Sequence, residues 1–201
     1  MNFTTFLHNE INLKRQENRN LLFKKSNIKL LLIKIEKYKI KYSDDRNIDD
    51  ILQEIHSSPY LQNILSKDPL KQNICEKSQI KYIQNINNGV NLEKPYKPIY
   101  IHNGEFLNIK TRECSIKSID AIITINDKTY YSYLKYINET GGAQDNQYND
   151  CKLFLRECLT FTEEHFFMLI VDGPYFSTKK MNELESFQTN NILIKNSDNI
   201  I

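Results

Sequence analysis

The sequence predicts an α/β protein in which an N-terminal helical region precedes a core of alternating strands and helices. Two observations lead to this prediction. Apolar residues recur at helical spacing among lysines through roughly the first 88 residues. Beyond them, Pro95 and Pro98 favour extended chain, and β-branched runs alternate with single helical stretches. We therefore predict a helical region over 1–88 and, over 89–201, a three-layer core with a mixed central sheet flanked by helices.

The helical region is predicted to contain three amphipathic stretches. They cover residues 3–42, 43–68 and about 71–87. Pro69 ends the second stretch, because proline lacks an amide donor and clashes with the preceding turn. Seven lysines between residues 24 and 41 form a basic face on the first stretch. This face is either simply solvated or lies along a phosphate backbone.

The core is predicted to begin with a hairpin around Asn103-Gly104, a pair that favours a two-residue turn. A second tight turn is expected at Asn126-Asp127, between two longer strands. In order, the expected elements are strands at 99–102, 105–107, 116–126 and 129–137, a helix at 144–159, a strand at 166–171, a helix at 179–187 and a strand at 191–195.

Composition limits the function classes only in part. The 27 basic and 25 acidic residues give a formal net charge of +2, so a polyanion-binding surface would have to arise from local clustering. The longest apolar run, 30–33, is far too short to span a bilayer, and the N-terminus lacks the pattern of an export signal. We therefore expect a cytoplasmic protein with no membrane partner. The four cysteines lack the paired spacing of a zinc site, so we expect reduced thiols.

Two neighbouring strands of the predicted core carry opposite charges. Asp120 interrupts an apolar run, where an unpaired carboxylate is costly, and Lys135 lies near the end of the next strand. Metal-assisted cleavage of a phosphodiester needs a carboxylate for the cation, further oxygen ligands and an amine near the phosphate. Asp120 and Lys135 can supply the carboxylate and the amine. The alternatives are a strand-edge aspartate and a lysine that points to solvent.

These residues resemble the motif of the PD-(D/E)xK nuclease superfamily, and in particular its type II restriction endonucleases. In that family an Asp ends or kinks one strand, and an acidic residue stands two positions before a Lys on the next strand. Asp120 and the segment Tyr133-Leu134-Lys135 occupy these places. The helical segment 144–148 matches the QxxxY element of several branches, and 166–176 resembles the strand and loop that follow it. The resemblance covers about the last half of the chain and implies a restriction-endonuclease-like core.

The resemblance implies a Mg²⁺-dependent endonuclease of a restriction-modification system, which hydrolyses double-stranded DNA at a specific site. Asp120 would bind the metal, Lys135 would assist the attacking water, and Gln144 and Tyr148 would support them. A homodimer is expected, because cutting both strands of a symmetric site calls for two copies of one active site. A cognate DNA methyltransferase would be the genetic partner. The alternatives are a DNA nuclease without site specificity and a catalytically inactive DNA-binding module.

Tyr133 stands where the motif has a carboxylate, and a phenol that is neutral at pH 7 cannot replace one. Three explanations stay open. The acidic ligand has moved to Glu76, Glu139 or Asp145, of which the last two are nearer in sequence. Alternatively, Asp120 with a backbone carbonyl and water holds a single metal, or the site is inactive. We expect Asp120 to bind Mg²⁺, with these three carboxylates as candidates for the missing ligand.

Overall fold

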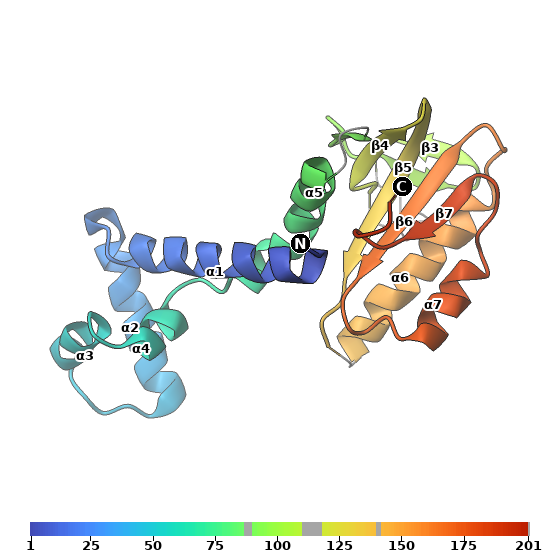
Figure 1. Ribbon diagram of the computed structural model, residues 1–201. Helices are drawn as coiled ribbons and strands as arrows, with labels where there is room; N and C mark the ends of the chain where they lie inside the picture. The colour runs from blue at the N-terminus through green and yellow to red at the C-terminus, as the bar shows by residue number, and fades with distance from the viewer. Residues whose placement is uncertain (87–89, 110–117, 140–141, 201) are drawn as a thin grey trace. The chain divides into compact units, whose positions relative to one another are not determined.

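The chain divides into two compact units. The computed structural model describes residues 1–86, 90–109, 118–139 and 142–200 (Figure 1). The helical unit comprises Thr5–Cys75, and the core unit comprises Met1–Thr4 and Glu76–Ile201. The sequence predicts the boundary after residue 88, whereas the structure assigns most of the last predicted helix to the core unit. That helix belongs there because it buries Ile83 in the apolar core beside the sheet.

The helical unit is formed by short helices around an apolar centre. They are α1 (Phe3–Leu22), whose first two residues belong to the core unit, η1 (Lys25–Asn27), α2 (Ile28–Tyr42), α3 (Ile48–Ile55), α4 (Pro59–Leu65) and η2 (Pro69–Gln72). The predicted stretches 3–42 and 43–68 are therefore each divided in two. The second divides at Ser58, whose hydroxyl accepts from the Leu61 amide (3.3 Å) and caps α4. The centre contains Leu22, Leu31, Ile35, Ile51, Ile55, Leu61 and Leu65.

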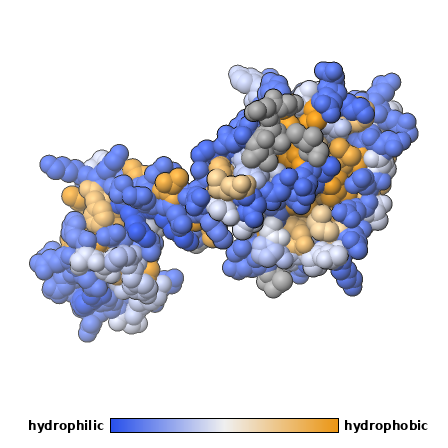
Figure 2. All heavy atoms as spheres, viewed as in Figure 1, coloured by the Kyte–Doolittle hydropathy of each residue, from blue (hydrophilic) through white to orange (hydrophobic). Residues whose placement is uncertain are grey.

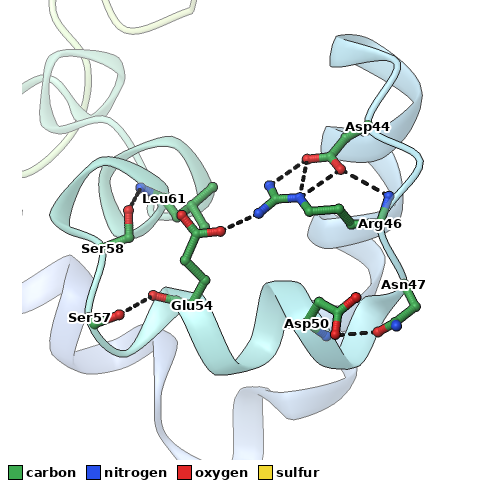
Figure 3. A network of polar contacts seen from close by, with 8 residues as sticks. All are labelled: Asp44, Arg46, Asn47, Asp50, Glu54, Ser57, Ser58 and Leu61. Atoms are coloured by element: carbon green, nitrogen blue, oxygen red, sulfur yellow. Dashed lines mark hydrogen bonds and ion pairs between the residues drawn. The ribbon is translucent and has the colours of Figure 1, made fainter.

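A polar network holds the loop between α2 and α3 (Figure 3). The Arg46 guanidinium donates to both carboxylate oxygens of Asp44, at 2.9 and 2.6 Å, and also pairs with Glu54 on α3. The hydrogen bonds from Arg46 lower the pKa of the Asp44 carboxyl to about 2. Asn47 caps α3 by accepting from the Asp50 amide at 2.8 Å. Two acidic side chains of the unit, those of Asp44 and Glu54, are thus held by one arginine.

The core unit contains a mixed five-stranded sheet of order β1-β4-β5-β6-β7. Antiparallel pairing joins β1 (Val90–Glu93), β4 (Ala121–Ile125) and β5 (Lys128–Tyr136). Parallel pairing joins β5, β6 (Phe166–Asp172) and β7 (Ile192–Lys195). A separate antiparallel hairpin is formed by β2 (Tyr100–His102) and β3 (Glu105–Leu107).

Both predicted tight turns are confirmed. Asn103 and Gly104 have φ of 47° and 81°, and Asn126 and Asp127 have φ of 48° and 62°, the positive values that a two-residue hairpin turn requires. The strand predicted at 116–126 is observed from Ala121, and residues 116 and 117 lie outside the described part of the chain. Strand β1 was not predicted, because its four residues are too few to establish a two-residue period.

Helices cover both faces of the sheet (Figure 1). On one face, α6 (Gly142–Cys158) and α7 (Thr178–Glu185) enclose an apolar core that includes Tyr133, Phe154 and Leu184. On the other face, α5 (Ile74–Ile86) and the C-terminal segment contribute Ile83 and Ile200. The core unit is therefore α/β, with a mixed sheet between helical layers, as the sequence predicts.

Two further expectations concern the membrane and the cysteines. Among the described residues, none of the helices combines the length and the hydropathy needed to cross a bilayer. Cys151 and Cys158 carry free thiols, and Cys114 lies outside the described residues. Burial raises the pKa of the Cys151 thiol to about 12, so this side chain is uncharged at neutral pH.

Candidate active site

Asp120 lies where the chain enters β4. Its amide donates to the Ser132 carbonyl on β5 (2.9 Å), and its carboxylate Oδ2 accepts from the Leu134 amide (2.9 Å). The preceding residue, Ile119, already bonds elsewhere, because its amide donates to the Ile99 carbonyl (2.8 Å). The carboxylate of Asp120 thus binds a backbone donor of β5 at the point where the chain joins the sheet. This placement agrees with an aspartate at a strand end.

Lys135 is buried near the end of β5, with only 3% of its surface exposed. Its ammonium nitrogen lies 3.4 Å from the Tyr133 hydroxyl, 3.9 Å from Glu76 Oε1 and 5.2 Å from the centre of the Tyr133 ring. A buried cation is costly unless it is paired and hydrogen-bonded. The carboxylate, the hydroxyl and the ring face together compensate the charge of Lys135.

Tyr133 fills the space beside this lysine. It is 1% exposed and stacks on Phe154 of α6, with ring centres 5.2 Å apart and an interplanar angle of 29°. Burial raises the pKa of its hydroxyl well above the ordinary value, and nearby Cys151, Asp150, Asp120 and Glu76 raise it further. The phenol is therefore neutral at pH 7. It accepts a hydrogen bond from Lys135 and supplies no carboxylate.

Glu76 comes to Lys135 from the first turn of α5. One turn later, Gln79 is completely buried and donates to the Lys135 carbonyl (3.4 Å) and to Asp172 Oδ2 (2.6 Å). Asp172 also accepts from the Ser197 amide (3.1 Å) and hydroxyl (2.6 Å). Burial raises the pKa of the Asp172 carboxyl. This network fixes α5 at the ends of β5 and β6 and thereby positions Glu76.

Asp145 and Tyr148, two of the site residues predicted from the sequence, contact α7 and the segment before it. Asp145 accepts a hydrogen bond from the Tyr175 hydroxyl and lies 3.9 Å from Lys180 Nζ. The Tyr148 hydroxyl donates to Glu183 Oε2 (2.7 Å) and approaches the Lys180 carbonyl (3.2 Å). These contacts join α6 to α7. The side chains of Asp145 and Tyr148 are thus engaged with 175–183 rather than with Asp120 or Lys135.

Glu139 follows β5, and Gln144 lies in the first turn of α6. Gln144 is half-buried near the start of α6. Glu139 is exposed three residues after the end of β5, where it lines an open pocket with Asn138, Pro174 and Tyr175. Of the three candidates for the missing carboxylate, the structure brings Glu76 to Lys135. Glu139 and Asp145 have other surroundings.

Few described side chains at this site are of the kind that ligates a metal ion. Within the described part of the chain, no group of three or more His, Cys, Asp or Glu side chains is arranged to hold a metal ion. Mg²⁺, however, commonly keeps several waters and binds through one or two carboxylates together with substrate phosphates. The charges of Asp120 and Glu76 both raise the pKa of the Tyr133 hydroxyl, and Glu76 Oε1 lies 3.9 Å from Lys135 Nζ. Two carboxylate ligands and water fit Mg²⁺ in this manner.

Gln79 and Asp150 belong to the surroundings of the site but were not singled out from the sequence. Spacing offered one signal, because Gln79 follows Glu76 by three residues and therefore shares its helix face. Asp150 on α6 acts on the Tyr133 hydroxyl across the sheet–helix interface, which spacing does not reveal.

No family model, curated protein or solved structure matches this chain.

Proposed function

We propose that this chain is a Mg²⁺-dependent endonuclease that cleaves double-stranded DNA at a specific site, with a restriction-endonuclease-like core. The observation that supports the proposal most is the placement of Lys135, which is buried beside Glu76 and Tyr133 near the end of β5. Asp120 lies directly before the neighbouring strand, β4, and its carboxylate accepts a hydrogen bond from the Leu134 amide. A buried cation beside a carboxylate from another segment is typical of a functional site.

The order of elements gives further support. A helix that carries Glu76 precedes an antiparallel pair that carries Asp120 and Lys135, and α6 then leads to the parallel strand β6. This order agrees with the resemblance to the PD-(D/E)xK nucleases, with Glu76 as the displaced carboxylate. It supports a single-metal site in which Asp120 and Glu76 are the protein ligands.

Each side chain of the site has a separate task in the proposed reaction. Asp120 and Glu76 would hold Mg²⁺, which supplies Lewis-acid polarisation of the phosphate and lowers the pKa of bound water. The Lys135 ammonium offsets charge at the scissile phosphate and orients the attacking water. The Tyr133 hydroxyl and ring restrict the position of that ammonium. The Leu134 amide orients the Asp120 carboxylate.

Partners follow from the same proposal. A double-strand cut at a symmetric site calls for two active sites, so the enzyme would act as a homodimer. A cognate DNA methyltransferase would protect the host's own sites. A reading frame for such an enzyme next to the gene would support restriction rather than general DNA degradation.

The proposal is tested with supercoiled plasmid and long mixed-sequence duplex DNA at low salt in Mg²⁺. We expect defined fragments from the parent protein. Glu76→Gln should slow cleavage by about 100-fold, the effect of removing one charge-stabilising group from an active site. Glu139→Gln is the matched control, because it removes the same charge from an exposed position, and it should cut like the parent.

Each of the other outcomes points to a different function. A smear in place of defined fragments would indicate a nuclease without site specificity. Binding of DNA with no cleavage in Mg²⁺, Mn²⁺ or Ca²⁺ would indicate an inactive binding module and contradict the proposal. Equal loss of activity in the Glu76 and Glu139 variants would refute the assignment of Glu76 as the ligand.

A further inference from the structure

Two pockets of the helical unit meet at Lys34 on α2. One has a volume of about 200 Å³ and includes Lys34 and Lys67 in its lining. The other has a volume of about 220 Å³ and includes Lys34, Lys37 and Lys41. Because Lys34 lines both pockets, the two pockets adjoin along α2. We call them together the lysine groove, defined by Lys34, Lys37, Lys41 and Lys67.

The charge of this groove is not balanced by the protein. Among the described residues that line the two pockets there is no carboxylate, and no ion pair joins these four lysines to a described acidic side chain. Lys34 is partly buried and donates to the Leu65 carbonyl (2.7 Å). Burial, and then the charge of Lys67, lower the pKa of Lys34. The fold therefore holds like charges together without a counter-ion from the chain.

Charge is segregated along the sequence of the helical unit. Residues 24–41 contain seven lysines and a single carboxylate, Glu36. Five of the nine acidic residues in 5–75 lie between residues 44 and 54, where Arg46 pairs with two of them (Figure 3). Just over half of the acidic side chains are thus on the α2–α3 loop and α3, and none of the nine lines either pocket. Such separation creates a positive field over one surface.

The spacing of the lysines suits a phosphate backbone. Lys34, Lys37 and Lys41 span eight residues of α2, and the seven steps from the first to the last rise by about 10 Å at about 1.5 Å per residue. One strand of duplex DNA carries a phosphate about every 3.4 Å along the axis, so this length corresponds to about three phosphates. Tyr42 adds an exposed aromatic ring near Lys41, whose ammonium lies 5.0 Å from the ring centre.

Apolar side chains also reach the surface of this unit. Figure 2 shows hydrophobic residues among hydrophilic ones over helices α1 to α4, and α2 exposes Leu30, Ile33 and Ile40. The lysines between them disfavour packing of α2 against a second copy of itself, because like charges would meet. Charge complementarity favours a polyanion as the occupant.

We propose that the lysine groove binds the phosphodiester backbone of double-stranded DNA. The choice of DNA among polyanions rests on the proposed function, whereas the affinity for phosphate rests on the groove itself. Lysine is a compact point charge that contacts phosphate without reading bases. The groove would therefore position DNA and contribute sequence-independent affinity.

The test is DNA binding in EDTA, measured by fluorescence anisotropy of a labelled duplex at several salt concentrations. The groove variant combines Lys37→Gln, Lys41→Gln and Lys67→Gln, three exposed positions, and retains Lys34 because it bonds the Leu65 carbonyl. Each lost phosphate contact reduces the slope of log K against log salt by about 0.9. The variant should therefore lose about 2.7 from the magnitude of the slope, with an unchanged circular-dichroism spectrum.

The matched control removes three exposed lysines from the core unit, through Lys94→Gln, Lys97→Gln and Lys179→Gln. It changes the net charge equally and should keep the slope of the parent. An unchanged slope in the groove variant, or an equal loss in the control, would overturn the proposal. Displacement of DNA by polyglutamate as effectively as by unlabelled duplex would also overturn it, because the groove would then read charge alone.

The same experiment separates the groove from the catalytic proposal. In the Asp120→Asn background the three groove substitutions should reduce the slope as much as in the parent, because Asp120 is not a residue of the groove. Binding with the expected slopes but no cleavage in Mg²⁺ would contradict the endonuclease and retain the groove. Cleavage by the parent with no effect of the groove variant on binding would retain the endonuclease and refute the groove.

Discussion

The two roles of Asp120 can be separated by substitution. Its carboxylate accepts from the amide of Leu134, a completely buried residue, and in the proposed reaction it also binds Mg²⁺. Asp120→Asn keeps an acceptor oxygen of nearly the same shape and removes the charge. Asp120→Ala removes both the acceptor and the charge. The two variants should therefore differ in stability and be alike in their lack of activity.

The expected size of the stability difference follows from the hydrogen bond. A buried amide left without an acceptor costs about 1–3 kcal/mol, so we expect Asp120→Ala to lower the free energy of unfolding by about 2 kcal/mol. In a chain of this length, that change lowers Tm by about 4–8 °C. Asp120→Asn should lose at most about half as much, since it gives up only the charge assistance of the bond.

The assays are thermal unfolding by circular dichroism and plasmid cleavage in Mg²⁺. Both variants should cut at least about 100-fold more slowly than the parent. If Asp120→Asn cuts as fast as the parent, Asp120 is not a metal ligand. If the Asp120→Asn and Asp120→Ala variants lower Tm equally, the hydrogen bond from the Leu134 amide does not stabilise the start of β4. That result would refute the stability prediction and leave the prediction on catalysis unaffected.

Two further predictions concern the end of β6. Burial raises the pKa of Asp172 above its unfolded value, so the folded state binds this proton more tightly, and its contribution to stability is lost as pH rises from about 4 through the folded pKa. Urea denaturation gives the free energy of unfolding of the parent and of Asp172→Asn at each pH. The difference, parent minus variant, should therefore fall as the pH rises from about 4 towards 7. Parallel pH profiles of the two proteins would refute this. Gly173 has φ of +104°, and a Cβ there would collide with the Ile137 carbonyl oxygen, so Gly173→Ala should lower Tm by several degrees in thermal unfolding, which an unchanged Tm would contradict.

Local sequence signals predicted most of the elements of the core. The turns at Asn103-Gly104 and Asn126-Asp127 are confirmed because their chemistry depends on adjacent residues. The boundary between the units was predicted too late, because periodicity shows that α5 is amphipathic but not which core it joins. Its Ile83 packs with Ala121 and Ile123, which are far away in sequence. The periodicity of one segment cannot predict which distant residues that segment packs against.

The same limit applies to the site. Alternation and turn chemistry predicted that Asp120 and Lys135 lie on adjoining segments, and pairing of β4 with β5 confirms this neighbourhood. Sequence spacing left Glu76, Glu139 and Asp145 as candidates for the missing ligand. Glu139 and Asp145 lie nearer to Lys135 in the sequence. Only the packing of α5 distinguishes Glu76 from them. Asp172 is buried at the end of β6 and bound by Gln79 and Ser197, contacts with distant parts of the chain that spacing does not reveal.

Tyr133 explains why the missing carboxylate would come from another element. Its ring occupies the β5 side of the α6 interface by stacking on Phe154, and its neutral hydroxyl supplies no anion for Lys135 from that strand. A buried ammonium needs an anion nearby, and Glu76 is the carboxylate that the structure places within 4 Å of it. The Gln79–Asp172–Ser197 network holds the helix that delivers Glu76. Compensation of Lys135 and a second ligand for Mg²⁺ would thus be provided by one side chain, which is why Glu76→Gln tests the proposal so directly.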